Sequence, residues 1–110
     1  LVCVHVEGAD EAGHAGDAVG KVRVLEGVDA HIVAPLLARL RREPSWRMLV
    51  IASHATPVAR RVHATDPVVF AIGGSDIASN RGDHFDESAG RLGELYVDEG
   101  WHLMSYFLKR

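Results

Sequence analysis

The feature that most constrains the fold of this sequence is an apolar stripe between residues 22 and 40. Its members recur at steps of three and four, the spacing of one face of an α-helix. They are Val22, Leu25, Val28, Ile32, Leu36 and Leu40. Asp17 precedes the stripe as a helix N-cap, and Pro35 lies inside it, where it should kink or restart the helix near Val33. We therefore predict a helix over Asp17–Arg41.

Short apolar runs flank this helix and have the composition of β-strands. Leu1–Glu7 is rich in valine, and Arg47–Ala52 follows the helix. A third apolar run occupies Pro67–Ile72. A strand, a helix and a second strand in this order form a βαβ unit, in which the helix covers one face of the sheet. We predict an α/β fold of three layers, with a mostly parallel or mixed sheet and flanking helices.

Two polar segments follow the first two predicted strands. We expect Gly8–Gly16 to be a glycine-punctuated loop and Ser53–Asp66 to be a long connection. Both would lie at the carboxyl ends of strands, where α/β sheets bind ligands. Their candidate metal ligands are one aspartate and three histidines: Asp10, His14, His54 and His63. Zn²⁺ and Mn²⁺ prefer such oxygen and nitrogen ligands, so a metal site is one interpretation. The alternative is a set of surface histidines that titrate near neutral pH.

Composition narrows the classes of function. The chain has 110 residues and a net charge of -3, with 12 basic and 15 acidic residues interspersed, so it lacks the basic cluster of a nucleic-acid interface. No apolar stretch is long enough to span a membrane, and the single cysteine, Cys3, excludes an internal disulfide. Because the sequence opens inside an apolar run at Leu1, we expect residues 1–110 to be one portion of a longer domain. The alternative is a trimmed small domain.

Four linked motifs run through the chain. They are D-E-A-G-H-A-G-D at 10–17, S-H-A-T-P at 53–57, V-H-A-T-D-P-V-V-F at 62–70 and G-W-H-L-M at 100–104. The first three resemble the patterns D-x-x-G-H-x-G-D, D-H-x-T-P and T-H-T-x-D-P-V-P-F of archaeal-type cofactor-independent phosphoglycerate mutases, which belong to the alkaline phosphatase superfamily. The resemblance covers nearly the whole chain in the right order. It implies the C-terminal, metal-binding portion of such an enzyme, with a partial alkaline-phosphatase-like core.

The resemblance also implies roles for five residues. Asp10, His14 and His63 match the three protein ligands of one divalent ion, and Ser53 and His54 match the pair that helps to hold a second ion. The family has aspartate where this chain has Ser53, and a neutral hydroxyl is a poorer ligand for a hard dication. The nucleophilic serine and a further aspartate ligand lie far upstream in the family. No catalytic residue is therefore identified in this chain.

The implied activity is that of a glycolytic, cytoplasmic, metal-dependent phosphoglycerate mutase, or of a related phosphate-ester phosphotransferase. The expected cofactor is a divalent metal (Mn, Zn or Mg), with up to two ions in the parent enzyme. The expected partners are a small-molecule phosphate ester and the missing N-terminal part of the enzyme. We expect neither a nucleic acid nor a membrane as a partner. An unpaired strand edge at Leu1 would favour self-association.

Two further points stay open in the sequence. Arg60 and Arg61 are candidates for phosphate binding, because guanidinium matches phosphate bidentately, and the alternative is an ordinary surface pair. The rival to an enzyme is a non-catalytic remnant kept as an interaction module. Ser53 favours the remnant, whereas the intact Asp10, His14 and His63 favour the enzyme. By either hypothesis we expect the chain alone to be inactive.

Overall fold

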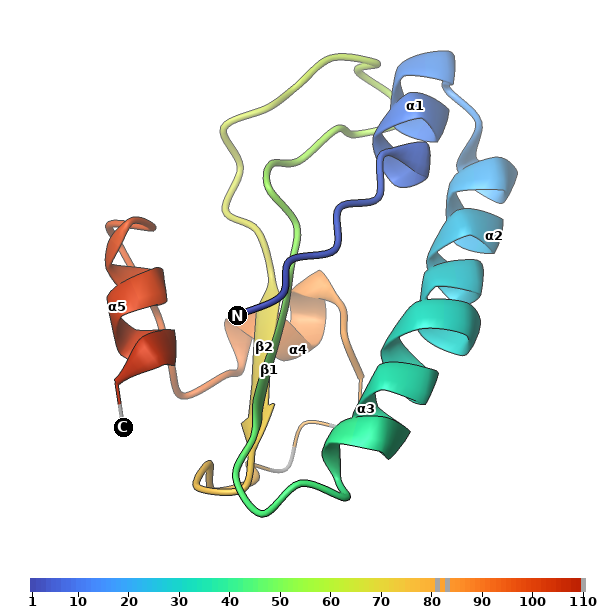
Figure 1. Cartoon of the computed structure of the whole chain (residues 1–110). Helices are drawn as coiled ribbons and strands as arrows, with labels where there is room; N and C mark the ends of the chain where they lie inside the picture. Colours follow the sequence, from blue (N-terminus) through green and yellow to red (C-terminus); the bar gives the residue numbers. More distant parts are fainter. Residues whose placement is uncertain (81, 83, 110) are drawn as a thin grey trace. The chain divides into compact units, whose positions relative to one another are not determined.

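A computed structural model describes residues 1–80, 82 and 84–109. The chain divides into two compact units, which we describe separately (Figure 1). Unit 1 contains residues 1–39 and 53–67, and unit 2 contains residues 40–52 and 68–110. Helices and strands are mixed along the chain, as the α/β prediction requires. Among the described residues, no helix combines the length and the apolar character needed to cross a membrane.

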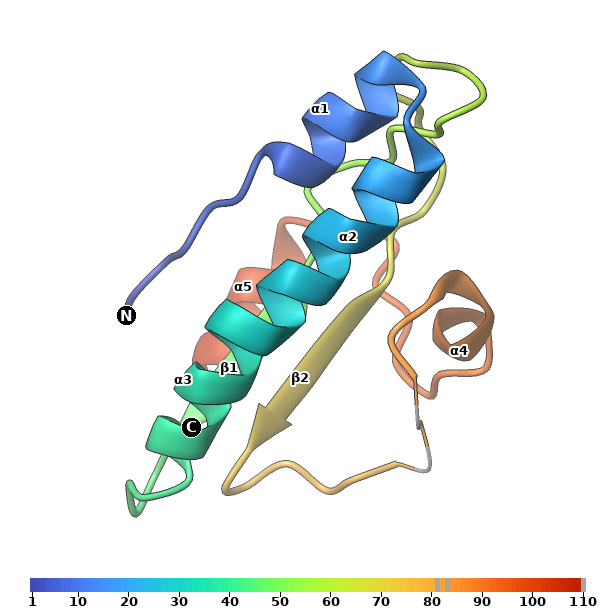
Figure 2. The same cartoon turned by 90° about the vertical axis from the view of Figure 1, so that its right-hand side faces the viewer.

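Unit 1 is mainly helical. Its helical elements are α1 (Gly8–Ala15), α2 (Ala18–Val28), the π-helical segment η1 (Asp29–Val33) and α3 (Ala34–Leu40), the last three forming one continuous rod (Figure 2). The carboxylate of Asp17 caps α2 by accepting a hydrogen bond from the backbone N–H of Gly20 at 2.8 Å. The helix widens into η1 directly before Pro35, because proline has no N–H to continue the ladder. The predicted helix and its disturbance near Val33 are both confirmed.

Two predictions for the first 16 residues are wrong. Leu1–Glu7 forms no strand, since the other described elements of unit 1 are helices and offer no ladder of backbone partners. The expected loop at Gly8–Gly16 is helix α1 for most of its length. Its first turn closes when the carbonyl of Glu7 accepts the N–H groups of Asp10 and Glu11 at 2.8 and 3.0 Å. Gly16 ends the helix with a φ of 74°, so this glycine marks a helix C-terminus rather than a loop.

Unit 2 is built on a two-stranded antiparallel sheet. Strand β1 (Arg47–Ile51) pairs with β2 (Phe70–Gly74), and helices α4 (Glu87–Arg91) and α5 (His102–Leu108) follow. The strand predicted at Arg47–Ala52 is confirmed. The next strand covers Phe70–Gly74 rather than the predicted Pro67–Ile72. Its range follows the antiparallel register, which pairs Phe70 with Ile51 and Gly74 with Arg47.

The predicted sheet differs from the one observed. Among the described residues the only sheet has two strands, β1 and β2, and they run antiparallel. The three-layer, mostly parallel or mixed arrangement is therefore not confirmed. That prediction depended on Leu1–Glu7 as a parallel neighbour, and this segment stays extended and exposed, with Leu1 and Val2 at 89% and 86% of their full exposure. Without a parallel partner, the βαβ unit is incomplete.

Arg47 links three parts of unit 2. Its guanidinium donates to the carboxylate of Asp76 after β2, with Nε 2.9 Å from Oδ1. Its Nη1 also donates to the backbone carbonyls of Phe107, at 2.8 Å, and Lys109 at the end of α5. The hydrogen bonds from Arg47 hold the pKa of Asp76 below its ordinary value, although desolvation acts against them.

Replacing Asp76 by asparagine should lower the Tm of the chain by roughly a few degrees at neutral pH. Because the folded-state pKa of Asp76 is lowered, the ion pair stabilises the fold above the unfolded-state pKa of about 4. This contribution is lost as the pH falls through the lower folded-state pKa. Thermal melts at a series of pH values should therefore show a gap between wild type and Asp76→Asn that closes in acid. The exposed Glu94→Gln should show no such gap, and an equal gap at every pH would contradict the assignment.

Candidate metal centre

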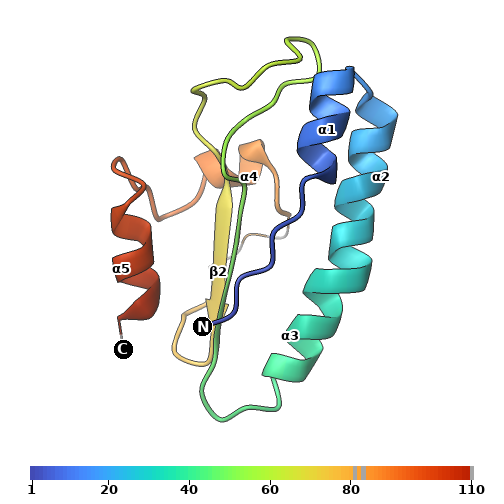
Figure 3. The same ribbon diagram turned by 45° about the horizontal axis from the view of Figure 1, so that its top comes forward.

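The candidate ligands come from two segments of unit 1 that contact each other, α1 and the connection at 53–67 (Figure 3). Helix α1 supplies Asp10 and His14, one turn apart. The connection supplies His54 and His63 on either side of a β-bridge, in which the N–H of residue 64 donates to the carbonyl of residue 55 at 2.8 Å. This bridge keeps the two imidazole rings together, with their centroids 3.8 Å apart.

Asp10 lies among the histidines. Its Oδ1 is 3.4 Å from Nε2 of His63, and its Oδ2 is 3.4 Å from Nε2 of His14. Ligand atoms of Asp10, His54 and His63 all lie within 4.8 Å of one another. The ring centroid of His14 is 4.9 Å from that of His63. The four residues singled out by sequence spacing therefore meet, and His54 belongs to the tightest group, where the resemblance had put His14.

The hydrogen bonding of His14 indicates that the group suits a cation. Its Nδ1 lies 2.9 Å from the backbone carbonyl oxygen of Arg61, which can only accept, so Nδ1 carries the proton. In the neutral ring, Nε2 then presents a lone pair to the carboxylate of Asp10. Two acceptors facing each other repel unless a proton or a cation lies between them. One carboxylate and three imidazoles are a donor set that fits a divalent transition metal.

Thr56 is a functional candidate that the sequence analysis missed. Its side chain is buried, with the residue only 5% exposed, and its hydroxyl donates to Oδ1 of Asp10. The hydroxyl oxygen also lies 3.2 Å from Nδ1 of His54. The hydrogen bond from Thr56 lowers the pKa of Asp10 against the opposing effect of burial. The available signal was the threonine of S-H-A-T-P, which matches the family pattern.

The backbone around Thr56 is held from two directions. The ammonium group of Lys21 on α2 donates to the carbonyl of Thr56 at 2.7 Å. On the other side α1 approaches through Gly13, which is buried. A Cβ atom at Gly13 would lie 2.6 Å from the Thr56 carbonyl oxygen, closer than real Cβ contacts. The close approach that brings Asp10 to the connection therefore requires glycine at position 13.

Three other residues were predicted to belong to the site: Ser53, Arg60 and Arg61. Ser53 is exposed beside His54, and its part in a second metal site stays a prediction. Arg60 pairs with Asp66, with Nη1 3.1 Å from Oδ2. Arg61 has a positive φ of 57°, which is uncommon outside glycine, and its carbonyl holds His14. Phosphate binding by either arginine stays a prediction.

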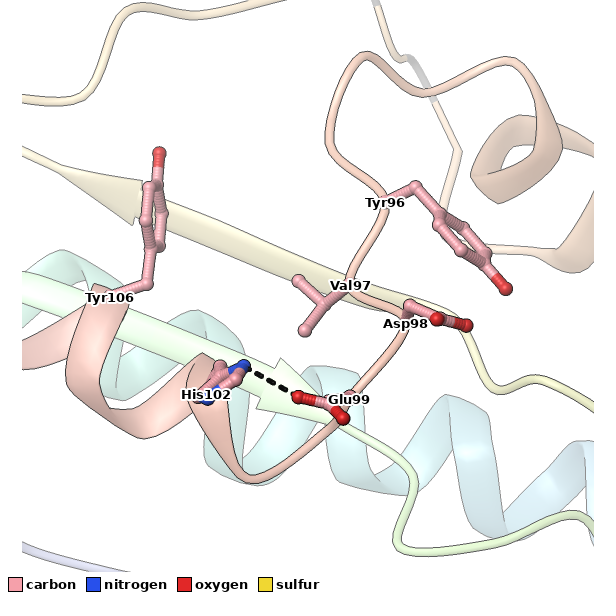
Figure 4. A pocket seen from close by; sticks show the side chains of 6 residues that line it. All are labelled: Tyr96, Val97, Asp98, Glu99, His102 and Tyr106. Carbon is pink, nitrogen blue, oxygen red and sulfur yellow. Dashed lines mark ion pairs between the residues drawn. The ribbon is translucent and has the colours of Figure 1, made fainter.

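A hollow of about 390 Å³ lies in unit 2 (Figure 4). Its lining residues are Tyr96, Val97, Asp98, Glu99, His102 and Tyr106. His102 pairs with Glu99 across 3.3 Å, so this histidine already has a local partner. None of the residues predicted for the site lines this hollow. The chemistry that suits a metal is concentrated in unit 1.

Comparison with known proteins gives one family match and several named relatives. Residues 1–103 match the family model described as the metalloenzyme superfamily. The relatives include three proteins named 2,3-bisphosphoglycerate-independent phosphoglycerate mutase. That of Methanothrix thermoacetophila is 42% identical over 91% of this chain and 26% of its own length. That of Methanosarcina barkeri is 39% identical over 99% of this chain and 28% of its own length. That of Aeropyrum pernix is 42% identical over 86% of this chain and 23% of its own length.

The match to these relatives covers only part of each relative. It includes most of this chain, yet the chain spans only about a quarter of the length of each relative. No solved structure gives a significant match.

Proposed function

Because the chain belongs to the metalloenzyme superfamily, we propose that it is the metal-binding portion of a metal-dependent phosphoglycerate mutase. The observation that carries this proposal is that three histidines, His14, His54 and His63, gather near the carboxylate of Asp10. The partial match to relatives named phosphoglycerate mutases supports the substrate, a small phosphate ester whose phosphoryl group moves between the 2 and 3 positions of glycerate. The reaction class, phosphoryl transfer, extends to related phosphate esters.

We assign Asp10, His54 and His63 to one divalent ion, with His14 beside them as a further donor. Three imidazoles favour Zn or Mn over Mg, which prefers oxygen ligands. When bound, such an ion polarises a phosphoryl group and lowers the pKa of an attacking hydroxyl. The role of the residues in this chain would be to bind the ion and fix its position. Up to two ions would be present in the parent enzyme, and the weak ligand Ser53 would serve the second.

The longer protein would supply what this chain lacks. The family resemblance assigns the nucleophilic serine and a further aspartate ligand to an upstream segment. It also implies a three-layer, mostly parallel or mixed sheet, in which Leu1–Glu7 would gain strand neighbours. Arg60 and Arg61 would contact the phosphate ester of the substrate, in the cytoplasm where glycolysis runs.

A remnant without catalytic function is the second candidate, and Ser53 is the observation that favours it. A hydroxyl in place of the family's carboxylate weakens any second metal site. The remnant would keep the fold and one metal site but would never complete a catalytic centre. The upstream reading frame separates the two functions, because only the enzyme needs an aspartate and a serine there.

The test is an assay of the full-length polypeptide that contains this chain. With Mn²⁺ or Zn²⁺, we expect conversion of 3-phosphoglycerate to 2-phosphoglycerate that a chelator stops and added metal restores. His14→Ala should abolish most of this turnover. Hydrolysis of an aryl phosphate without isomerisation would move the function to a related phosphatase. A full-length protein with no metal-dependent reaction on either substrate would favour the remnant.

A further inference from the structure

We propose that Thr56 is a positioning residue that holds Asp10 and His54 in the orientation needed to bind one ion. The inference rests on the proposed function, since it concerns the same metal centre. The hydroxyl of Thr56 contacts the side chains of both residues, one from each of the two segments that form the site. It therefore joins α1 to the connection directly at the ligands.

Counting protons gives the direction of each hydrogen bond. A threonine hydroxyl has one proton, and Thr56 donates it to the carboxylate of Asp10, which can only accept. The hydroxyl oxygen can then only accept from His54, whose Nδ1 lies 3.2 Å away. Nδ1 of His54 must therefore carry its proton, and Nε2 keeps the lone pair that a metal requires. Thr56 thus selects the tautomer of His54 while it orients Asp10.

The surroundings of Thr56 keep this hydroxyl in place. The residue is only 5% exposed, so water has little access to replace the hydroxyl. Lys21 donates to its carbonyl at 2.7 Å. Gly13, which has no Cβ atom, lets α1 pack closely against the same carbonyl. Outer hydrogen bonds of this kind fix the ring orientation and tautomer of metal-binding histidines.

The tautomer of His14 is also set by a hydrogen bond, in this case to a backbone carbonyl. Its Nδ1 donates to the carbonyl of Arg61 at 2.9 Å, so its Nε2 also keeps a lone pair. Because that acceptor is a backbone atom, side-chain substitution at Arg61 leaves it in place. Thr56 is the position where this kind of control depends on a side chain and can be removed by mutation.

The experiment compares Thr56→Val, which keeps the shape but removes the hydroxyl, with Thr56→Ser, which keeps the hydroxyl. Zn²⁺ and Co²⁺ affinities of the 110-residue chain are measured by competition titration, with the Co²⁺ absorption spectrum as a report on ligand geometry. We expect Thr56→Val to lose about 10- to 100-fold in affinity and to change the spectrum. Thr56→Ser should stay close to wild type. Thr65→Val, the same change at an exposed position of the connection, is the matched control.

A second measurement uses the metal-free chain. Nitrogen-15 NMR shifts at about pH 8, where imidazoles are mostly neutral, report which ring nitrogen of His54 carries the proton. Wild type and Thr56→Ser should show the Nδ1–H form, and Thr56→Val should show a mixture. Equal metal affinity and an unchanged tautomer in Thr56→Val would overturn the positioning role. If the wild-type chain binds no metal, the same titrations are made on the full-length polypeptide, which adds the upstream aspartate. A full-length protein that binds no metal would overturn the proposed function, while the tautomer would still decide whether Thr56 controls His54.

Discussion

The 110-residue chain alone, supplied with Mn²⁺ or Zn²⁺, will show no phosphoglycerate mutase turnover. The family mechanism passes the phosphoryl group through a serine, and the matching serine lies outside this sequence. Ser53 does not replace it, because Ser53 occupies a position that matches a metal ligand. Losing the nucleophile removes the phosphoenzyme route altogether. Slow attack by water on a phosphate ester is the most that a positioned ion would leave, and such residual catalysis is orders of magnitude weaker.

The measurement is an assay of the purified chain with 3-phosphoglycerate and with an aryl phosphate. His14→Ala, assayed in parallel, controls for contaminating phosphatases, since a contaminant's activity would not respond to this change. Metal-dependent mutase turnover that His14→Ala abolishes would show that these residues suffice, and would refute the view that a longer protein is needed. The full-length polypeptide provides the positive control.

Replacing Asp10 by asparagine will remove most of the metal affinity of the chain, by at least about 100-fold. Asp10 is the only carboxylate in the group and faces His14, His63 and Thr56. Asparagine has nearly the same shape but no charge, so the three imidazoles would have to bind a dication without a compensating negative ligand. The fold should persist, because the side chain of Asp10 is one-third exposed, at 34%.

Elemental analysis after dialysis against Zn²⁺ checks this result, with competition titration giving the size of the loss. Glu11→Gln is the matched control, because it removes one carboxylate from the neighbouring, exposed position of α1. Its affinity should equal that of wild type. Equal metal content in wild type and Asp10→Asn would show that the ion binds elsewhere, and would remove the central ligand from the proposed centre.

The sequence determined the elements whose patterns are local and strong. The stripe from Val22 to Leu40 specified the long helix, and Asp17 and Pro35 specified its start and its disturbance, because caps and prolines act on the nearest turn of backbone. The apolar run at Arg47–Ala52 likewise became β1. The sequence also identified Asp10, His14, His54 and His63 as candidate ligands, since the type of side chain is enough to show which residues can bind a metal.

The tertiary structure decided which of these residues meet and what holds them. The glycines of 8–16 predicted a loop, yet bonds to the Glu7 carbonyl and a C-terminal Gly16 make it α1, which no periodicity in so short a segment reveals. Strand direction depended on which partner lay beside β1, and that is a long-range property of the chain. The role of Thr56 depends on the close approach of α1 at Gly13. Hydrogen bonds between residues 46 positions apart, such as Thr56 to Asp10, follow from packing and leave no local pattern in the sequence.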